Sequence, residues 1–191
     1  FGRNPLLMKF EWTDENIFLI NNHFKCCDYY EERIASVRAL QSYIDDSLYN
    51  SNVIVLGDLN DKIEEPDSNN VFIDFIDDSL NFYFADMEIV LGDTQLWSAP
   101  LWPQHIDHIL ITNELFDEFN HTNSKVETLL LDENFINSND EYLGYFYYYW
   151  QLISNHRPVG IRLYFNNNET LMGDINQDGF VDILDVIILV N

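Results

Sequence analysis

The feature that most constrains this chain is an unbroken apolar run, Val53-Ile54-Val55-Leu56, which stops at the loop Gly57-Asp58-Leu59-Asn60. A short apolar run without polar alternation is typical of a strand buried on both faces. A buried strand therefore delivers polar side chains to a loop, an arrangement that suits a binding or catalytic site.

Further predicted strands and several predicted helices flank this strand in the sequence. The predicted strands span residues 6–12, 17–24, 106–112, 125–131 and 158–165, and the predicted helices span 28–49, 70–80 and 114–119. The turn at 13–16 makes the first two strands an antiparallel hairpin. The first helix is amphipathic, with apolar residues at three- and four-residue spacing. The pattern predicts a mixed α/β fold, and the tyrosine-rich stretch at 142–150 is assigned to neither class.

The charge of the chain limits its partners. Nine Lys and Arg against 33 Asp and Glu give a formal net charge of −24, which repels phosphate backbones unless cations bridge them. Tight nucleic-acid binding without metal is therefore disfavoured, unless a local basic patch overrides this field. Lys25, Lys62 and Arg157 are the local cations that could attract a phosphate backbone.

Three further features bear on processing and compartment. The adjacent cysteines Cys26 and Cys27 are too close for an ordinary disulfide, so no disulfide framework is expected. No apolar run is long enough to span a membrane. The start at Phe1, without methionine or a signal segment, suggests a piece of a longer chain.

The region after residue 165 changes composition. A polar linker at 166–172 precedes a loop at 174–185 that has Gly179 at its sixth position, as calcium loops require. The loop's oxygen ligands for Ca²⁺ are Asp174, Asn176, Asp178, the backbone carbonyl of Phe180, Asp182 and Asp185. An acidic turn before a helix is the alternative. The loop and the apolar helix face after it resemble one repeat of a type I dockerin, which implies a cohesin-like partner. Dockerins have two such repeats, so the module appears here in part.

Four motifs occur in an order and spacing that resemble the endonuclease/exonuclease/phosphatase superfamily, whose fold is deoxyribonuclease I-like. They are Asn21-Asn22-His23, Gly57-Asp58-Leu59-Asn60, Ile106-Asp107-His108-Ile109 and Ser154-Asn155-His156-Arg157-Pro158-Val159. Taken singly, each motif is more often structural than functional. Together they imply hydrolysis of phosphate esters with Mg²⁺ or Mn²⁺ as cofactor.

The resemblance implies a role for each of five catalytic residues. Asp58 would orient or deprotonate the attacking water, and Asn60 would bind the scissile phosphate or the metal shell. His23 would contact a phosphoryl oxygen, with Asn21 also on the substrate side. His156 would act at the phosphate, with Asp107 accepting its other ring N–H, so these two side chains should be neighbours.

Other residues are given structural or weaker roles. Histidines 105, 108 and 121 are expected to be structural or at the surface, and Arg157 is expected to shape its loop. Asn155 replaces the charged ligand that the family has before the histidine, so it would bind Mg²⁺ weakly. The family's N-terminal half, with an Asn and a metal-binding Glu, has no counterpart in this sequence.

These observations predict a four-layer α/β sandwich that lacks its N-terminal half, at 1–165, then a linker at 166–172 and a partial dockerin-like repeat at 173–191. The predicted function is a secreted bacterial endonuclease or exonuclease that hydrolyses phosphodiester bonds in nucleic acid or in a small phosphodiester. The alternative is a non-catalytic attachment module on a decayed phosphoesterase scaffold. Alone, the chain is expected to be inactive and poorly stable, because apolar strand faces would be exposed.

Overall fold

The computed structural model describes residues 3–12, 15–66, 68–134 and 149–165. The elements are β1 (Leu6–Trp12), β2 (Glu15–His23), α1 (Tyr30–Ser47), β3 (Asn52–Asp58), α2 (Ile73–Asp77), β4 (Phe82–Phe84), α3 (Met87–Val90), η1 (Thr94–Leu96), β5 (Asp107–Thr112), η2 (Asn113–Leu115), α4 (Phe116–Phe119), β6 (Lys125–Thr128), η3 (Leu131–Asn134), α5 (Tyr149–Leu152) and β7 (Val159–Arg162). The predicted linker and calcium loop lie outside the described residues.

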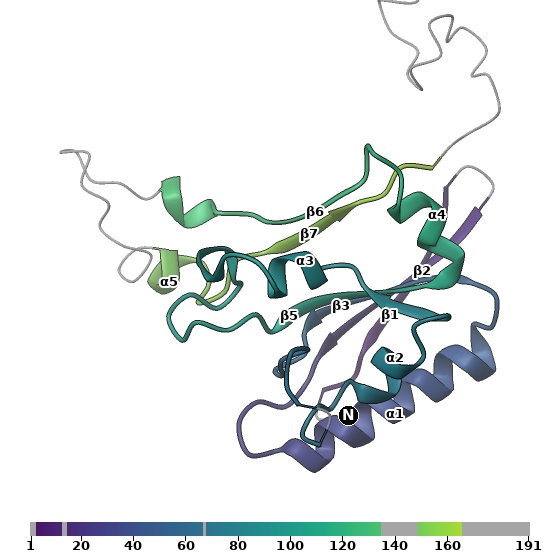
Figure 1. The fold of residues 1–191 in the computed structure, drawn as a ribbon, viewed down its shortest axis with the longest axis horizontal. Helices are drawn as coiled ribbons and strands as arrows, with labels where there is room; N and C mark the ends of the chain where they lie inside the picture. The colour runs from purple at the N-terminus through teal and green to yellow at the C-terminus, as the bar shows by residue number, and fades with distance from the viewer. Residues whose placement is uncertain (1–2, 13–14, 67, 135–148, 166–191) are drawn as a thin grey trace, which may run out of the picture.

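The described part of the chain forms three layers. A five-stranded sheet in the order β1-β2-β3-β5-β4 lies between helices α1 and α2 on one face and the two-stranded sheet β6-β7 on the other (Figure 1). Strands β2 and β3 run parallel, and the other neighbouring pairs are antiparallel. The mixed α/β sandwich predicted from the sequence is confirmed, with three of its four expected layers seen in these residues.

Two apolar clusters hold the layers together. Beneath the five-stranded sheet, Val37, Leu40 and Ile44 of α1 pack with Val53 and Val55 of β3. On the opposite face the cluster contains Ile17, Ile54, Ile109, Ile111 and Leu115, against which residues of β6 and β7 pack. Because side chains alternate between the two faces of β3, its unbroken apolar run serves both clusters.

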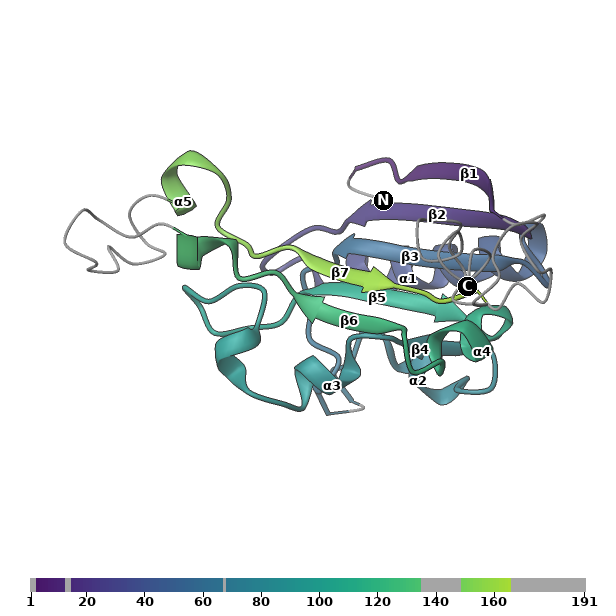
Figure 2. The same ribbon diagram turned by 90° about the horizontal axis from the view of Figure 1, so that it is seen from above.

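Strand β1, at the far edge of the five-stranded sheet, is exposed along its whole length in the part of the chain that the structure describes. Strands β6 and β7 lie over β5, whereas β1 forms the edge on the other side (Figure 2). Leu6, Met8 and Trp12 on one face of β1 are 59%, 49% and 57% exposed. Because burying apolar surface is a main source of folding free energy, this strand contributes little to stability as it stands.

One predicted helix is shorter in the structure, and one short strand was not predicted. The helix expected at 70–80 is reduced to α2, because Asn70 is tied to the preceding loop. Its Nδ2 donates to the Ile63 and Glu65 carbonyls at 2.6 and 3.1 Å, and its Oδ1 accepts from Phe72 N at 2.9 Å. Strand β4 was missed, because three residues are too few to show a period. None of the described helices is long and apolar enough to cross a membrane.

Candidate active site

Polar residues from three neighbouring strands meet at one end of the large sheet. The register of β2 and β3 pairs His23 with Asp58, and the register of β3 and β5 pairs Asp58 with Asp107. The ends of the parallel strands β2 and β3 therefore meet the beginning of antiparallel β5. The fold itself places the three side chains in one row.

The loop before β7 adds His156 to this row. Its Nδ1 lies 2.8 Å from Asp107 Oδ2 and 3.9 Å from Asp58 Oδ2. The expectation that Asp107 and His156 are neighbours is confirmed. A carboxylate at Nδ1 keeps the proton there, which leaves Nε2 to act on a substrate. The hydrogen bond to Asp107 raises the pKa of His156, burial opposes it, and the charges of Asp107 and Asp58 raise it further.

Asp58 is the carboxylate at the centre of the row. Its side chain is 18% exposed, and its Oδ1 accepts a hydrogen bond from Asn60 N at 3.0 Å. Burial raises the pKa of Asp58, and repulsion from Asp107 raises it further, whereas His156 and His23 lower it. Two carboxylates close together in a half-buried site favour an added cation, because the cation allows both to stay ionised.

The donor set of this site fits a divalent metal. One ligand atom each from Asp58, Asp107 and His156 lies within 4.8 Å of the other two. Carboxylate oxygens are ligands that Mg²⁺ and Mn²⁺ accept in proteins. Asp58 and Asp107 are therefore the residues of this group that could hold the ion implied by the sequence, with His156 beside it.

The loop after β3 is held by its backbone. Gly57 has φ of 132°, and a Cβ built on it would lie 2.0 Å from the Asn22 carbonyl oxygen. Only glycine fits there, and it sets the direction in which Asp58 leaves the strand. Phe24 N donates to Asp58 O, and Leu59 N donates to Ile106 O, both at 2.9 Å.

Two predicted residues are oriented differently from their proposed roles. His23 Nε2 lies 3.3 Å from Asp58 Oδ2, and Arg3 contacts its Nδ1, so both ring nitrogens face protein groups. His23 must turn to reach a phosphate. Asn60, with φ of 54°, donates from Nδ2 to the Phe24 carbonyl at 3.0 Å and so braces the loop.

The remaining predicted site residues lie at the margin. Asn21 and Asn155 are exposed. Asn21 Oδ1 lies close to Gly57, on the side where a Cβ would project. The calcium ligands Asp174, Asn176, Asp178, Phe180, Asp182 and Asp185 lie outside the described residues and stay predictions.

Comparison with known proteins gives the fold. No protein-family model and no curated protein matches this sequence. Truncated TDP2 from Caenorhabditis elegans has 13% identity and a TM-score of 0.53, and the match covers 84% of this chain and 59% of that one. A second C. elegans TDP2 structure has 12% identity and a TM-score of 0.50, with 84% and 45% covered. The human Nocturnin catalytic domain with bound sulfate has 19% identity and a TM-score of 0.45, with 64% and 43% covered.

This chain has the deoxyribonuclease I-like fold. That is the fold that the four motifs predicted. The chain spans less than two thirds of the length of each of these structures.

Within the deoxyribonuclease I-like scaffold, a buried cluster lies behind the site. Asp86 Oδ2 lies 2.7 Å from His108 Nδ1 and 3.0 Å from His105 Nε2, and all three residues are buried. Burial would raise the pKa of Asp86, but the charges and hydrogen bonds of the two histidines hold it well below its usual range. The structural role expected for these histidines agrees with their burial. Asp86 was not singled out from the sequence. It follows the apolar run Phe82–Ala85, much as Asp58 follows the apolar run of β3.

Arg157 has the loop-shaping contacts that the sequence suggested. Its Nε and Nη2 donate to the two carboxylate oxygens of buried Asp132 at 2.9 and 2.6 Å, and its Nη1 donates to the Gln95 carbonyl at 2.5 Å. This forked pair orients the chain next to His156. His121 stacks on Tyr164, with ring centroids 4.0 Å apart.

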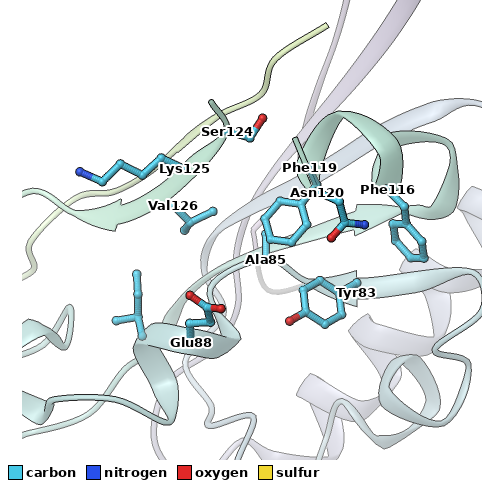
Figure 3. Close-up of a pocket in the computed structure, with 10 residues that line it drawn as sticks. Tyr83, Ala85, Glu88, Phe116, Phe119, Asn120, Ser124, Lys125 and Val126 are labelled. Carbon is cyan, nitrogen blue, oxygen red and sulfur yellow. The ribbon is translucent and has the colours of Figure 1, made fainter. Parts of the chain in front are cut away.

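A separate pocket of about 720 Å³ lies between β4 and β6 (Figure 3). Tyr83, Phe116 and Phe119 line one side of it, with Glu88 and Lys125 near its rim. Its lining contains one carboxylate and no histidine, so the groups suited to phosphate chemistry gather elsewhere.

Proposed function

We propose that this chain carries the catalytic end of a metal-dependent phosphodiesterase. The observation that carries the proposal is the convergence of Asp58, Asp107 and His156 on one point at the end of the sheet. General-base, electrostatic and metal-binding groups within reach of one another are what phosphodiester hydrolysis requires. The fold shared with TDP2 agrees with this function.

Each residue of the row has a distinct task. Asp58, whose pKa is raised, accepts a proton from the attacking water. His156 directs Nε2 at a phosphoryl oxygen, and its raised pKa favours the protonated ring, which stabilises negative charge there. Asp107 orients that ring through Nδ1. When bound, Mg²⁺ or Mn²⁺ supplies polarisation of the phosphoryl oxygens.

The net charge of −24 favours a metal-assisted approach of any anionic substrate. A small phosphodiester and a nucleic acid both satisfy the site's chemistry. We propose that the substrate is a nucleic acid. We also propose that the protein is secreted, because dockerin-like repeats are found on secreted bacterial hydrolases.

The direct test is hydrolysis of bis-p-nitrophenyl phosphate and of plasmid DNA by the full protein that contains this chain. Activity that needs Mg²⁺ or Mn²⁺ and is lost in EDTA is expected. A folded protein that binds Mn²⁺ and cleaves neither substrate supports the non-catalytic attachment module instead. The exposed Asn155 in place of a charged ligand is the observation behind that second candidate.

Manganese is expected to stabilise the protein by binding at the Asp58 site. At a concentration 100-fold above Kd, a ligand that binds only the folded state adds about 2.7 kcal/mol, which raises Tm by roughly 5–10 °C. Differential scanning fluorimetry measures the shift. Asp58→Asn should lose most of it, whereas Asp174→Ala, in the separate calcium loop, should keep it. An undiminished shift in Asp58→Asn would place the ion elsewhere.

Calcium is expected to bind the loop at 174–185 in a 1:1 ratio. Asp174 occupies the first ligand position, so Asp174→Ala should abolish that binding in calorimetry. Asp93→Ala, which removes an exposed acid in η1's cap, is the control. Unchanged binding in Asp174→Ala would contradict the dockerin-like interpretation. A cohesin domain should then bind the protein only in calcium, and the protein should be found in the medium of the producing cells.

A further inference from the structure

Asp86 is the centre of a buried hydrogen-bond network behind the row of candidate catalytic groups. It is fully buried, and its Oδ1 accepts from Ile109 N at 2.8 Å. Its Oδ2 meets His108 Nδ1 at 2.7 Å and His105 Nε2 at 3.0 Å. One carboxylate thus contacts both ends of the segment that contains Asp107.

The His108 branch reaches the loop after β3. His108 Nε2 lies 2.9 Å from the Asp61 carbonyl, three residues beyond Asp58. The Asp61 side chain in turn accepts from Arg33 Nε at 2.8 Å. Arg33 Nη1 donates to the Lys25 and Cys27 carbonyls, both at 3.0 Å, in the loop that follows His23.

The contacts of His105 lead through Ser98 to the segments that carry Asp107 and His156. Ser98 N donates to His105 Nδ1 at 3.2 Å, and Ser98 Oγ accepts from Asp107 N at 3.2 Å. The Ser98 carbonyl accepts from Arg157 N at 2.7 Å, in the residue after His156. Every segment that carries a group of the row is therefore connected to Asp86.

The cluster of Asp86, His105 and His108 is held by hydrogen bonds and is not a metal site. Two histidines and a carboxylate are plausible metal ligands, but a histidine binds metal through a nitrogen that carries no proton. Ser98 N–H occupies the lone pair of His105 Nδ1, so the proton of a neutral ring sits on Nε2, which lies 3.0 Å from Asp86 Oδ2. His108 has an acceptor at each ring nitrogen, so both nitrogens donate.

We propose that Asp86 is a positioning residue for the phosphoesterase site, where it acts through two buried histidines to fix the segments that carry Asp58, Asp107 and His156. This inference rests on the proposed function for its catalytic meaning. The structural part of the inference does not depend on that function, because it predicts which backbone segments become more mobile together when Asp86 is replaced.

The test is Asp86→Asn in the full protein, followed by amide hydrogen exchange and by hydrolysis of bis-p-nitrophenyl phosphate. Asparagine keeps the size of Asp86 but turns an N–H₂ toward two ring N–H groups. Exchange should become about tenfold faster or more in residues 57–62, 98–108 and 155–158, with α1 unchanged, because local opening is separate from global unfolding. The kcat should fall about 10- to 100-fold with KM within twofold, because a small misplacement of catalytic groups is costly.

Val37→Ala is the matched control. Val37 is buried under the sheet, and its apolar side chain makes none of the hydrogen bonds of the network, so this change lowers global stability without cutting a link. It should accelerate exchange in α1 and the sheet together and leave kcat within twofold. If Asp86→Asn gives the same uniform pattern, or no change, Asp86 only supports the fold and the proposal is overturned.

Two further outcomes are separable. If no variant hydrolyses any phosphoester, the proposed function fails, while the exchange pattern still decides whether Asp86 holds these segments. If Asp86→Asn does not fold, Ser98→Ala removes only the Oγ, which accepts from Ile106 N at 3.3 Å and from Asp107 N at 3.2 Å. It should accelerate exchange at 105–108 with α1 unchanged, and an unaltered pattern in a folded Ser98→Ala protein would also overturn the proposal.

Discussion

Replacing Asp58 by asparagine is expected to lower kcat for phosphodiester hydrolysis by about 10²–10⁴-fold, because a general base is lost while the amide fills the same space. The metal-free protein should be no less stable, since the change removes a half-buried charge that Asp107 repels. Steady-state kinetics with bis-p-nitrophenyl phosphate and thermal melts give both numbers.

The chain offers a matched control for this variant. Asp93 also follows a glycine, but it lies in an exposed turn, where its carboxylate accepts from Gln95 N at 2.9 Å. Asp93→Asn should retain the parent kcat. His156→Ala should match the loss in Asp58→Asn, and the double variant should add little to either, because groups that act as a unit are not additive. Full activity in Asp58→Asn would remove it from the mechanism.

Replacing Gly57 by alanine is expected to destabilise the fold by roughly 2–6 kcal/mol. The new Cβ would meet the Asn22 carbonyl, an overpacking cost of about 1–3 kcal/mol, and the backbone strain at positive φ adds about 1–3 kcal/mol. Activity should fall as well, because relief of the clash displaces Asp58. Urea unfolding followed by circular dichroism measures the loss.

Gly160 in β7 is the comparison. A Cβ built there meets nothing within 4 Å, so Gly160→Ala should leave the free energy of unfolding unchanged or slightly increased. Equal losses in the two variants would show that the Gly57 turn is not a special constraint. A loss confined to Gly57→Ala ties the geometry of the turn to the position of the site.

The mixed fold and the position of Asp58 at the end of a buried strand could be predicted from local patterns. The apolar run of β3 ends in Asp58, and a run of that kind buries both faces wherever it lies in a sheet. The hairpin and α1 follow equally from period and turn residues. The pairing of Asp107 with His156 required the resemblance, since 49 positions separate them in the sequence numbering.

The orientation of individual side chains was decided only by the tertiary structure. No local pattern indicates that His23 turns toward Asp58, or that the Asn60 side chain donates a hydrogen bond to the Phe24 carbonyl. Asn70 delays the start of the expected helix to Ile73, because its partners lie five and seven residues back, in a loop without a period.

By itself, the sequence determined the buried strand β3 and the polar residues that follow it, because those properties depend on neighbours along the chain. The network around Asp86 was decided by the fold alone. Its members lie in α1, in β5 and in the loops around the strands, and a buried carboxylate has no periodic signature. Only the packing of these segments reveals that one carboxylate is connected, through its two histidines and then through Ser98 and Arg33, to every part of the site.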